Sequence, residues 1–322
     1  MISLFCLERE KRGGPIYLER LSKIINIECN TYINSSVKKN FLTFIFKAIF
    51  FKQKLVIANG ILGIPLLLIF FYFKKKITIV HTPIKHISKK SKFLINIYLK
   101  LNRDNKLIFV ANHIKENYFN EFKNDVIDKR SMVIYGPSTY LVPPKISYKK
   151  ISKTKNCVNL IFVGGESPEK GLFFCISLLK ELNKSKSIKY KLHVFGKIKK
   201  DLKSYKNLIN HQFQENPFFG FNEINSIHLM PSKYEGMPLS FIDALANQIP
   251  TFLNDIEASQ ELKKLGIKSV TILKLNVQKW ARLISKFKWD NVNADELEND
   301  LKLYNKIVEK QLKNFVKTIN DD

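Results

Sequence analysis

The chain has 322 residues, enough for about two domains, and its 45% hydrophobic and 25% charged content excludes a wholly disordered or fibrous chain. It carries 54 Lys and Arg against 28 Asp and Glu, a formal net charge of +26, which predicts an anionic partner and leaves the fold open. The four cysteines form no CxxC pair or Cys/His cluster, which disfavours a zinc module or disulfide scaffold and favours a reducing compartment.

Short apolar segments alternate with helical patterns through the first half of the chain. An amphipathic helix pattern covers residues 16–27. Strands that alternate with helices are typical of βαβ units, which build a parallel sheet. The strands predicted in this half are 2–7, 55–58, 77–81, 107–111 and 131–135.

The same alternation returns in the second half, with strands predicted at 160–163, 191–195, 227–230, 250–253 and 269–273. Helices are predicted at 171–183, 238–248, 258–265, 277–287 and 295–319. The predicted fold is therefore α/β, with two Rossmann-like doubly wound domains facing a central cleft, and ligands of such folds bind at the carboxyl ends of the strands. The expected divisions are an N-terminal domain at 1–145, a Pro- and Lys-rich linker at 146–156, a C-terminal domain at 157–300, and a helix at 301–322 that packs back towards the N-terminal domain.

Positive charge is concentrated in the first half. Residues 1–150 carry 27 Lys and Arg against 9 Asp and Glu, and residues 29–103 contain 13 Lys, one Arg and no acid. Apolar and aromatic runs at 41–54 and 61–76 accompany these lysines, a combination that suits an anionic membrane surface. A nucleic-acid partner is disfavoured, because Arg, the usual bidentate phosphate ligand, is scarce. A codon bias towards Lys, Asn, Ile and Phe explains part of the excess but not the loss of acids.

Neither a membrane-spanning helix nor a secretory signal is predicted. The longest apolar run, 61–73, has 13 residues, fewer than the ~20 that cross a bilayer. The residues from 55 to 73 are also explained by a strand, a turn at Asn59-Gly60 and a buried helix. The first 20 residues contain three glutamates and no apolar core of the kind that a signal peptide needs.

The segment VGGESPEKG (163–171) is the first of two candidate binding segments. An apolar strand runs into Gly164 and Gly165, and Lys170 stands near the start of the next helix. Glycines let the backbone approach a ligand closely, and a lysine beside a helix N-terminus can hold phosphate. An ordinary β–α turn is the alternative interpretation.

The segment PSKYEGMPLSFIDALANQIP (231–250) places Glu235 after a strand and Asp243 on a helix. The two carboxylates are eight positions apart, which is at most ~12 Å along a helix axis. That separation suits a nucleotide-diphosphate sugar, whose hydroxyl groups lie at both ends of a diphosphate. The backbone expected to face the diphosphate is that of Gly236, Met237, Pro238 and Leu239.

GGESPEKG and SKYEGMPLSFIDALA resemble the two signature segments of the family 4 glycosyltransferases, retaining enzymes with the two-Rossmann-domain GT-B fold. The resemblance is good over residues 158–275 and traceable over 1–140. It implies transfer of a sugar from a nucleotide-diphosphate sugar, with the donor on the C-terminal half and the acceptor on the N-terminal half. It also implies chemistry without a metal, and no Asp-x-Asp pair at a predicted strand end suggests otherwise. No cofactor is expected besides the donor.

The resemblance assigns roles to residues of the second half. Glu235 corresponds to the catalytic carboxylate that binds the donor sugar, Asp243 to the carboxylate that binds ribose, and Lys170 to a phosphate-binding lysine. Two of the chain's departures from the family concern these roles. The signature Glu-x7-Glu is Glu-x7-Asp here, and Gly165 stands where the family has the arginine of VGR, so that one of two phosphate cations is missing.

In the first half, Gly13 and Gly14 resemble a Gly-Gly loop near the donor phosphates. The strand end ITIVH resembles the position of an active-site histidine, which is His81 here. This histidine would polarise a hydroxyl of the donor sugar or help the acceptor dock. A structural histidine without a catalytic role is the alternative interpretation.

These observations predict a lipid-linked or envelope glycan acceptor, in the synthesis of a bacterial surface polysaccharide such as O-antigen, capsule or lipopolysaccharide. The expected location is the cytoplasm, peripheral on the inner face of the cytoplasmic membrane. Two alternatives stay open: a sugar-nucleotide epimerase of the same architecture, and a non-catalytic partner subunit with a degraded donor site. No short motif encodes the sugar, the nucleotide base or the linkage.

Overall fold

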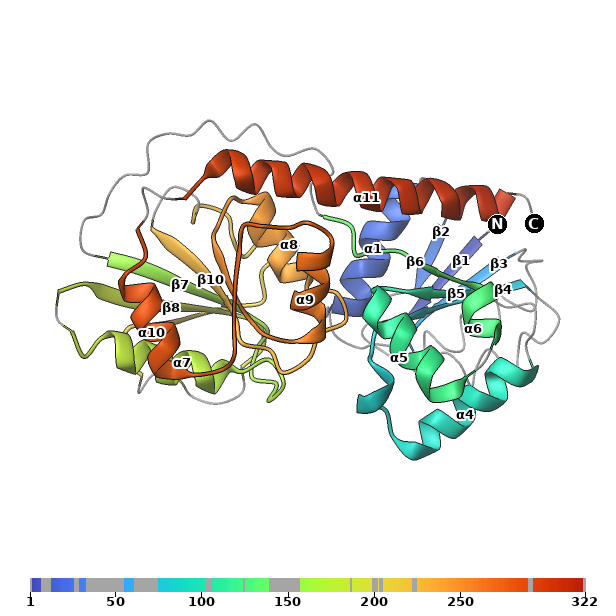
Figure 1. Ribbon diagram of the computed structural model, residues 1–322, viewed down its shortest axis with the longest axis horizontal. Coiled ribbons are helices and arrows are strands. Elements are labelled where there is room, and N and C mark those ends of the chain that lie inside the picture. The colour runs from blue at the N-terminus through green and yellow to red at the C-terminus, as the bar shows by residue number, and fades with distance from the viewer. Residues whose placement is uncertain are drawn as a thin grey trace. The chain divides into compact units, whose positions relative to one another are not determined.

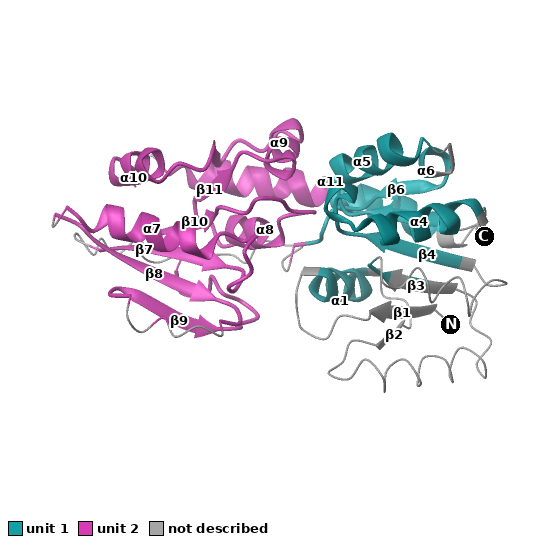
Figure 2. Cartoon of the chain, turned by 90° about the horizontal axis from the view of Figure 1, so that it is seen from below, with its two compact units in different colours: residues 1–137, 307–322 teal, residues 138–306 magenta. Residues whose placement is uncertain are grey.

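Two compact units make up the chain, and Figure 2 colours them separately: residues 1–137 with 307–322, and residues 138–306. We call them unit 1 and unit 2 and describe each by itself. Each has its own parallel sheet with helices beside it, which confirms the predicted fold class. The predicted domain limits and the cleft stay predictions, and the predicted linker lies outside the described residues. The computed structural model describes residues 2–6, 13–25, 29–32, 55–60, 75–101, 106–123, 125–138, 157–185, 187–198, 202, 205–221, 225–288 and 292–320.

Unit 1 contains a parallel sheet of strand order β2-β1-β3-β4-β5-β6. The five predicted strands are present, and β2 is an edge strand that the sequence pattern did not predict. Figure 1 shows α1 and the end of α11 on one side of this sheet and α4 and α5 on the other. The strands are β1 (Ile2–Cys6), β2 (Cys29–Tyr32), β3 (Leu55–Asn59), β4 (Lys75–Val80), β5 (Lys106–Phe109) and β6 (Ser131–Val133). The helices are α1 (Gly13–Ile25), η1 (Ile84–His86), α4 (Lys89–Leu101), α5 (Asn112–Phe122) and α6 (Asp125–Lys129).

Unit 2 contains a parallel sheet of strand order β12-β11-β10-β7-β8-β9. The chain runs outward from β7 through β8 and β9, then returns to β10 on the other side of β7, so a topological switch point lies between β7 and β10. The predicted strands and helices are all present, and the edge strand β9 is an addition. The strands are β7 (Cys157–Val163), β8 (Lys189–Phe195), β9 (Leu208–Gln212), β10 (Ser226–Met230), β11 (Thr251–Asn254) and β12 (Val270–Leu273). The helices are α7 (Leu172–Leu182), α8 (Leu239–Ala246), α9 (Glu257–Lys264), α10 (Val277–Ser285) and α11 (Ala294–Asn320).

The long final helix α11 is shared between the units, because its residues up to 306 belong to unit 2 and those from 307 to unit 1. In unit 2, the buried Asp300 carboxylate accepts hydrogen bonds from the Ser269 amide at 2.7 Å and the Lys268 amide at 2.8 Å. In unit 1, Gln311 Oε1 accepts a hydrogen bond from the Tyr135 amide at 2.9 Å. Within the described ranges, no helix is long and apolar enough to cross a membrane.

The two faces of the unit 2 sheet have cores of different character. On one face, alternate residues of β7 and β8 such as Leu160 and Val194 pack with α7 and with Trp280 of α10, and this cluster is almost wholly apolar. The other face is apolar near the carboxyl ends of the strands, where Phe195 packs with Phe218 and Ala244. Alternation along the strands therefore fixes the register and the position of each loop at the carboxyl edge.

A layer of buried polar side chains continues that second face. His193 of β8 and His228 of β10 each pair with Ile161 of β7 in the sheet register. His193 contacts Asn159 Oδ1 at 3.0 Å and His211 Nε2 at 2.8 Å. Burial lowers the pKa of His193 to about 4 and that of His228 to about 3, so both imidazoles are neutral at pH 7.

This layer makes the stability of unit 2 depend on pH. In the unfolded chain these histidines take up protons near pH ~6.5, whereas their pKa values in the fold lie near 4 and 3. The unfolded state therefore binds more protons as the pH falls from ~6.5 to ~4, and the free energy of unfolding falls with it. We expect urea unfolding between about pH 7 and pH 5 to show this loss, and the His193→Asn/His228→Gln double variant to show a smaller one. Equal losses in the two proteins would contradict the assignment.

Candidate functional site

The turn after β7 lies at the switch point of unit 2. Backbone amides of Gly164 and Gly165 both donate to the Phe195 carbonyl at the end of β8, at 2.9 and 3.3 Å. Gly165 has φ +64°, in the left-handed region that favours glycine. The predicted glycine pair thus ends a buried strand and folds over its neighbour.

The turn after β8 contacts the β7 turn backbone to backbone. A Cβ on Gly196 would lie 2.4 Å from the Gly165 nitrogen, and a Cβ on Gly165 would lie 2.8 Å from the Lys197 carbonyl oxygen. Both distances are too short for any side chain, so each position requires glycine. Sequence reasoning did not assign a role to Gly196, although a glycine that directly follows a buried strand is a usable signal.

A third turn joins through Gly171, which precedes α7 with φ +81°. A Cβ there would lie 2.7 Å from the carbonyl oxygen of Pro231, the residue that follows β10. The Lys233 amide also donates to the Glu169 carbonyl at 2.8 Å. The segment with Lys170 is thereby held against the segment with Glu235.

Lys170 and Glu235 form the most direct contact of the candidate site. The ammonium Nζ donates to Glu235 Oε1 at 2.6 Å and to Oε2 at 2.8 Å. The side chain of Lys170 is 32% exposed and that of Glu235 is 12% exposed, so the pair is partly buried but still accessible to a ligand. Tyr234 lies in the field of this pair, and its pKa is raised by burial and by the carboxylates of Glu169 and Glu235. Both members of the pair were predicted from the sequence, but their contact was not.

The loop after Glu235 leads into α8. The helix was predicted from residue 238 and begins at Leu239, with Pro238 as its N-cap and no side-chain cap among the described residues. In its first turn the Leu239 amide donates to the Met237 carbonyl at 2.9 Å and the Phe241 amide to the Pro238 carbonyl at 3.0 Å, and the amide end of a helix carries partial positive charge. Asp243 follows on the same helix, half-buried. The structure therefore offers a lysine, a carboxylate, a helix N-terminus and a second carboxylate in succession, a set that can bind an anion flanked by hydroxyl groups.

Three predicted residues belong to unit 1. His81 directly follows β4, and its Nε2 contacts Asn59 Oδ1 at 2.5 Å. The amide oxygen can only accept, so Nε2 carries the proton and Nδ1 is an acceptor. Burial lowers the pKa of His81 to about 4, and Tyr17 lies edge-on to the ring at 5.1 Å between centroids. At neutral pH, His81 is thus an uncharged acceptor.

Gly13 and Gly14 open α1 and do not form the loop predicted for them. Pro15 follows within the first turn of this helix, where a residue without an amide hydrogen is tolerated. The two glycines therefore present helix N-terminal amides, which are as suited to an anion as loop amides are. How Gly13, Gly14 and His81 relate to the unit 2 residues stays a prediction.

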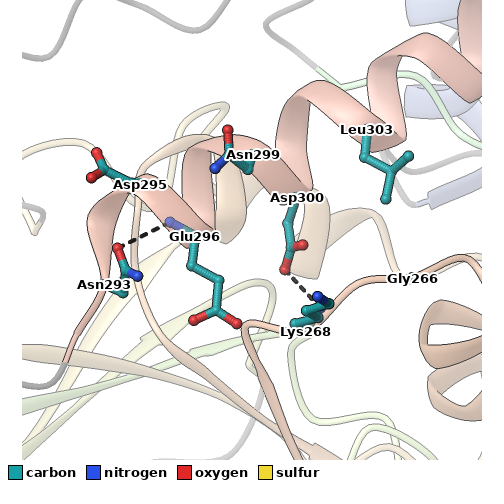
Figure 3. A pocket seen from close by; sticks show the side chains of 8 residues that line it. All are labelled: Gly266, Lys268, Asn293, Asp295, Glu296, Asn299, Asp300 and Leu303. Atoms are coloured by element: carbon teal, nitrogen blue, oxygen red, sulfur yellow. Dashed lines mark hydrogen bonds between the residues drawn. The ribbon is translucent and has the colours of Figure 1, made fainter.

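A separate pocket of about 430 Å³ lies in unit 2 between the segment after α9 and the start of α11 (Figure 3). Its charged lining has more acid than base, with Asp295, Glu296 and Asp300 against Lys268. None of the predicted site residues is among the described residues that line this pocket. An acidic lining repels a diphosphate, so this pocket is not a candidate for the donor.

Among the described residues, no three His, Cys, Asp or Glu side chains are grouped in a way that could hold a metal ion. Independence from metal stays a prediction.

Comparison with known proteins gives one family model and several solved structures of the same fold. A sequence model described as "Glycosyl transferases group 1" matches residues 145–308. No curated protein sequence gives a significant match.

Solved structures share the fold along the whole chain. The structure of Alr3699/HepE from Anabaena in complex with UDP and glucose has a TM-score of 0.78 at 13% identity, covering 100% of both chains. WaaB, a lipopolysaccharide outer core galactosyltransferase, has a TM-score of 0.64 at 13% identity, covering 100% of this chain and 99% of its own. WaaG, described as involved in lipopolysaccharide biosynthesis, has a TM-score of 0.67 at 12% identity and 99% coverage of both chains. These likenesses show the GT-B fold.

The glycine contact predicts that the missing arginine cannot be restored at Gly165. Gly165→Arg combines left-handed backbone strain with a Cβ only 2.8 Å from the Lys197 carbonyl oxygen. Gly220 has φ +80° and nothing within 4 Å, so Gly220→Arg adds the strain alone, about 1–2 kcal/mol. We expect Gly165→Arg to lower the melting temperature well below that of Gly220→Arg in thermal unfolding. Equal melting temperatures, or tighter UDP binding by Gly165→Arg, would contradict the packing argument.

Proposed function

The chain belongs to the group 1 glycosyl transferases, and from that premise we propose that it is a retaining transferase moving a sugar from a nucleotide-diphosphate sugar to a lipid-linked or envelope glycan. One observation carries this proposal: the Lys170–Glu235 pair at the switch point of unit 2. Parallel α/β sheets bind ligands at such a point. UDP is the first nucleotide to test, since the HepE structure contains it.

Donor binding would divide the Lys170–Glu235 pair between two partners. The diphosphate is a better partner for the Lys170 ammonium, because it brings more negative charge than one carboxylate. Glu235, released from the lysine, would accept hydrogen bonds from hydroxyls of the sugar. In the free protein each group thus holds the other in place and keeps the half-buried charges compensated.

The chemistry needs little from the protein beyond fixed charge. In a retaining transfer of the kind we propose, the acceptor hydroxyl attacks the face from which the diphosphate leaves, and a phosphate oxygen takes its proton. Lys170 and the amides at the start of α8 would stabilise the developing negative charge on the leaving group, as preorganised dipoles do in many enzymes. Asp243 would accept hydrogen bonds from ribose. No metal is needed for this scheme.

His81 would act as a neutral acceptor. Its Nε2 proton is engaged by Asn59, which leaves the Nδ1 lone pair for a hydroxyl of the donor sugar or of the acceptor. The low pKa of about 4 keeps it uncharged at the pH of the cytoplasm, where we place the protein, on the inner face of the cytoplasmic membrane. An acceptor anchored in lipid fits the excess of positive charge in residues 1–150.

The donor is tested by thermal unfolding with UDP-, GDP-, ADP- and CMP-linked sugars, with and without EDTA. A ligand that binds the folded state raises the melting temperature by mass action. We expect one nucleotide class to do so, to be unaffected by EDTA, and to lose its effect in Asp243→Ala. If none of the nucleotide sugars raises the melting temperature, the result favours a non-catalytic partner subunit. If the reaction products contain isomerised donor and no sugar transferred to lipid, they favour an epimerase.

Mutation of the two members of the Lys170–Glu235 pair should affect UDP affinity differently. Lys170→Ala removes a charged phosphate contact, and we expect UDP affinity to fall roughly tenfold to a hundredfold. Glu235→Gln removes the partner that competes with UDP for Lys170, so UDP should bind at least as tightly as before. Sugar transfer by Glu235→Gln should nevertheless fall by about a hundredfold or more. Calorimetry with UDP and a transfer assay measure the two effects.

Lys184→Ala supplies the matched control, because Lys184 also forms a 2.6 Å ion pair, with Glu181 on the surface of unit 2. It should leave both UDP affinity and transfer unchanged. Near-normal transfer by Glu235→Gln would remove the catalytic assignment. A loss of UDP affinity in Glu235→Gln as large as in Lys170→Ala would instead assign the pair a structural role.

A further inference from the structure

Helix α4 carries apolar side chains on both of its sides. One side buries Ile95, Tyr98 and Leu99, and Tyr98 Oη hydrogen-bonds Thr78 of β4 at 2.9 Å. The opposite side leaves Phe93 65% exposed and Leu94 39% exposed. At about 100° per residue, the outward positions fall within an arc of about 140°. We call this set the α4 outer face: Lys89, Lys90, Phe93, Leu94, Ile97 and Lys100.

The charge on α4 and on the segment that precedes it is of one sign. Residues 75–101 contain seven lysines and no acid. The carboxylate of Glu121 on α5 lies 2.8 Å from the ammonium of Lys92, whose side chain is 25% exposed. Because this carboxylate is paired with Lys92, it does not neutralise the lysines of the α4 outer face. Phe119 of α5 is a further large apolar side chain that is 41% exposed. Helices α4 and α5 lie on the same side of the unit 1 sheet (Figure 1).

This combination selects among the possible partners. Protein interfaces are depleted in lysine, and they bury their apolar side chains in a continuous centre. Nucleic-acid surfaces favour arginine, whose guanidinium binds phosphate with two hydrogen bonds. On the α4 outer face, Lys89, Lys90 and Lys100 flank the three apolar residues at both ends, so each apolar side chain has a lysine three or four residues away on the same side of the helix. Lysine stems can lie along acyl chains while their ammonium groups reach lipid phosphates.

We propose that the α4 outer face docks unit 1 on an anionic lipid bilayer, with α4 lying flat at the level of the headgroups. Phe93, Leu94 and Ile97 enter the boundary of the acyl chains, and Lys89, Lys90 and Lys100 bind lipid phosphates. One short helix of this kind supports reversible attachment. The inference deepens the proposed function, since it names the surface through which the enzyme reaches a lipid-linked acceptor.

The test is co-sedimentation of the full chain with vesicles, in the absence of donor and acceptor. Vesicles of phosphatidylcholine with about one third phosphatidylglycerol supply the anionic surface, and pure phosphatidylcholine the neutral one. We expect binding to the anionic vesicles only, reduced by added salt. The Phe93→Ser/Leu94→Ser double variant should lose about tenfold or more in partitioning, because it removes the inserted apolar area. The exposed positions leave folding unaffected, which circular dichroism verifies.

Phe173→Ser is the matched control, since Phe173 is an exposed phenylalanine on helix α7 of unit 2, 46% accessible. It should bind anionic vesicles like the unchanged protein. The proposal is overturned if the double variant binds as well as the unchanged protein, or if Phe173→Ser loses as much. Equal binding to neutral and anionic vesicles, or binding to neither, also overturns it. None of these results depends on the donor, and a failed donor panel would leave vesicle binding as it is.

Discussion

Three turns of unit 2 meet backbone to backbone, and that meeting depends on glycines at 165, 171 and 196. Any Cβ at these positions would lie 2.4–2.8 Å from a backbone atom of the neighbouring turn. Because the turns touch, Lys170 comes within 2.6 Å of a carboxylate that is 65 residues away in the sequence. The charges of the candidate site are thus positioned by the exclusion of side chains, and not by their own attraction. An ion pair on long, flexible side chains could not specify such a geometry by itself.

The architecture was predictable because its causes are local. Buried strands of unit 2 are short apolar runs, and its helices have apolar faces, so periodicity located them to within a few residues. The edge strands β2 and β9 were not predicted, because the prediction depended on this local apolar pattern. In β9, Leu208 and Ile209 are followed by Asn210, His211 and Gln212, which carry no apolar alternation. Their strand conformation comes from pairing with a neighbour and not from their own side chains.

The chemistry of the candidate site was predictable in kind but not in arrangement. Glu235, Asp243 and Lys170 stand in recognisable segments, and resemblance assigned them roles. Their pairing depends on Gly171 and Gly196, whose neighbours in space are distant in the chain, and no local pattern reveals such a contact. The neutral state of His81 likewise follows from burial and from Asn59, which lies 22 residues earlier. Charge composition pointed to lipid, while the outward apolar side of α4 emerged only when the inward side was known.

Helix α11 has a consequence for the order in which the protein is made. Unit 1 takes most of its residues from the start of the chain, yet Val308, Leu312 and Phe315 of α11 are among its buried residues. Synthesis of the residues that unit 2 requires ends at residue 306, when unit 1 still lacks these side chains. Domains usually fold in the order of their synthesis. Here the unit that begins first is the last to be completed, and its core lacks Val308, Leu312 and Phe315 until the end of the chain has been made.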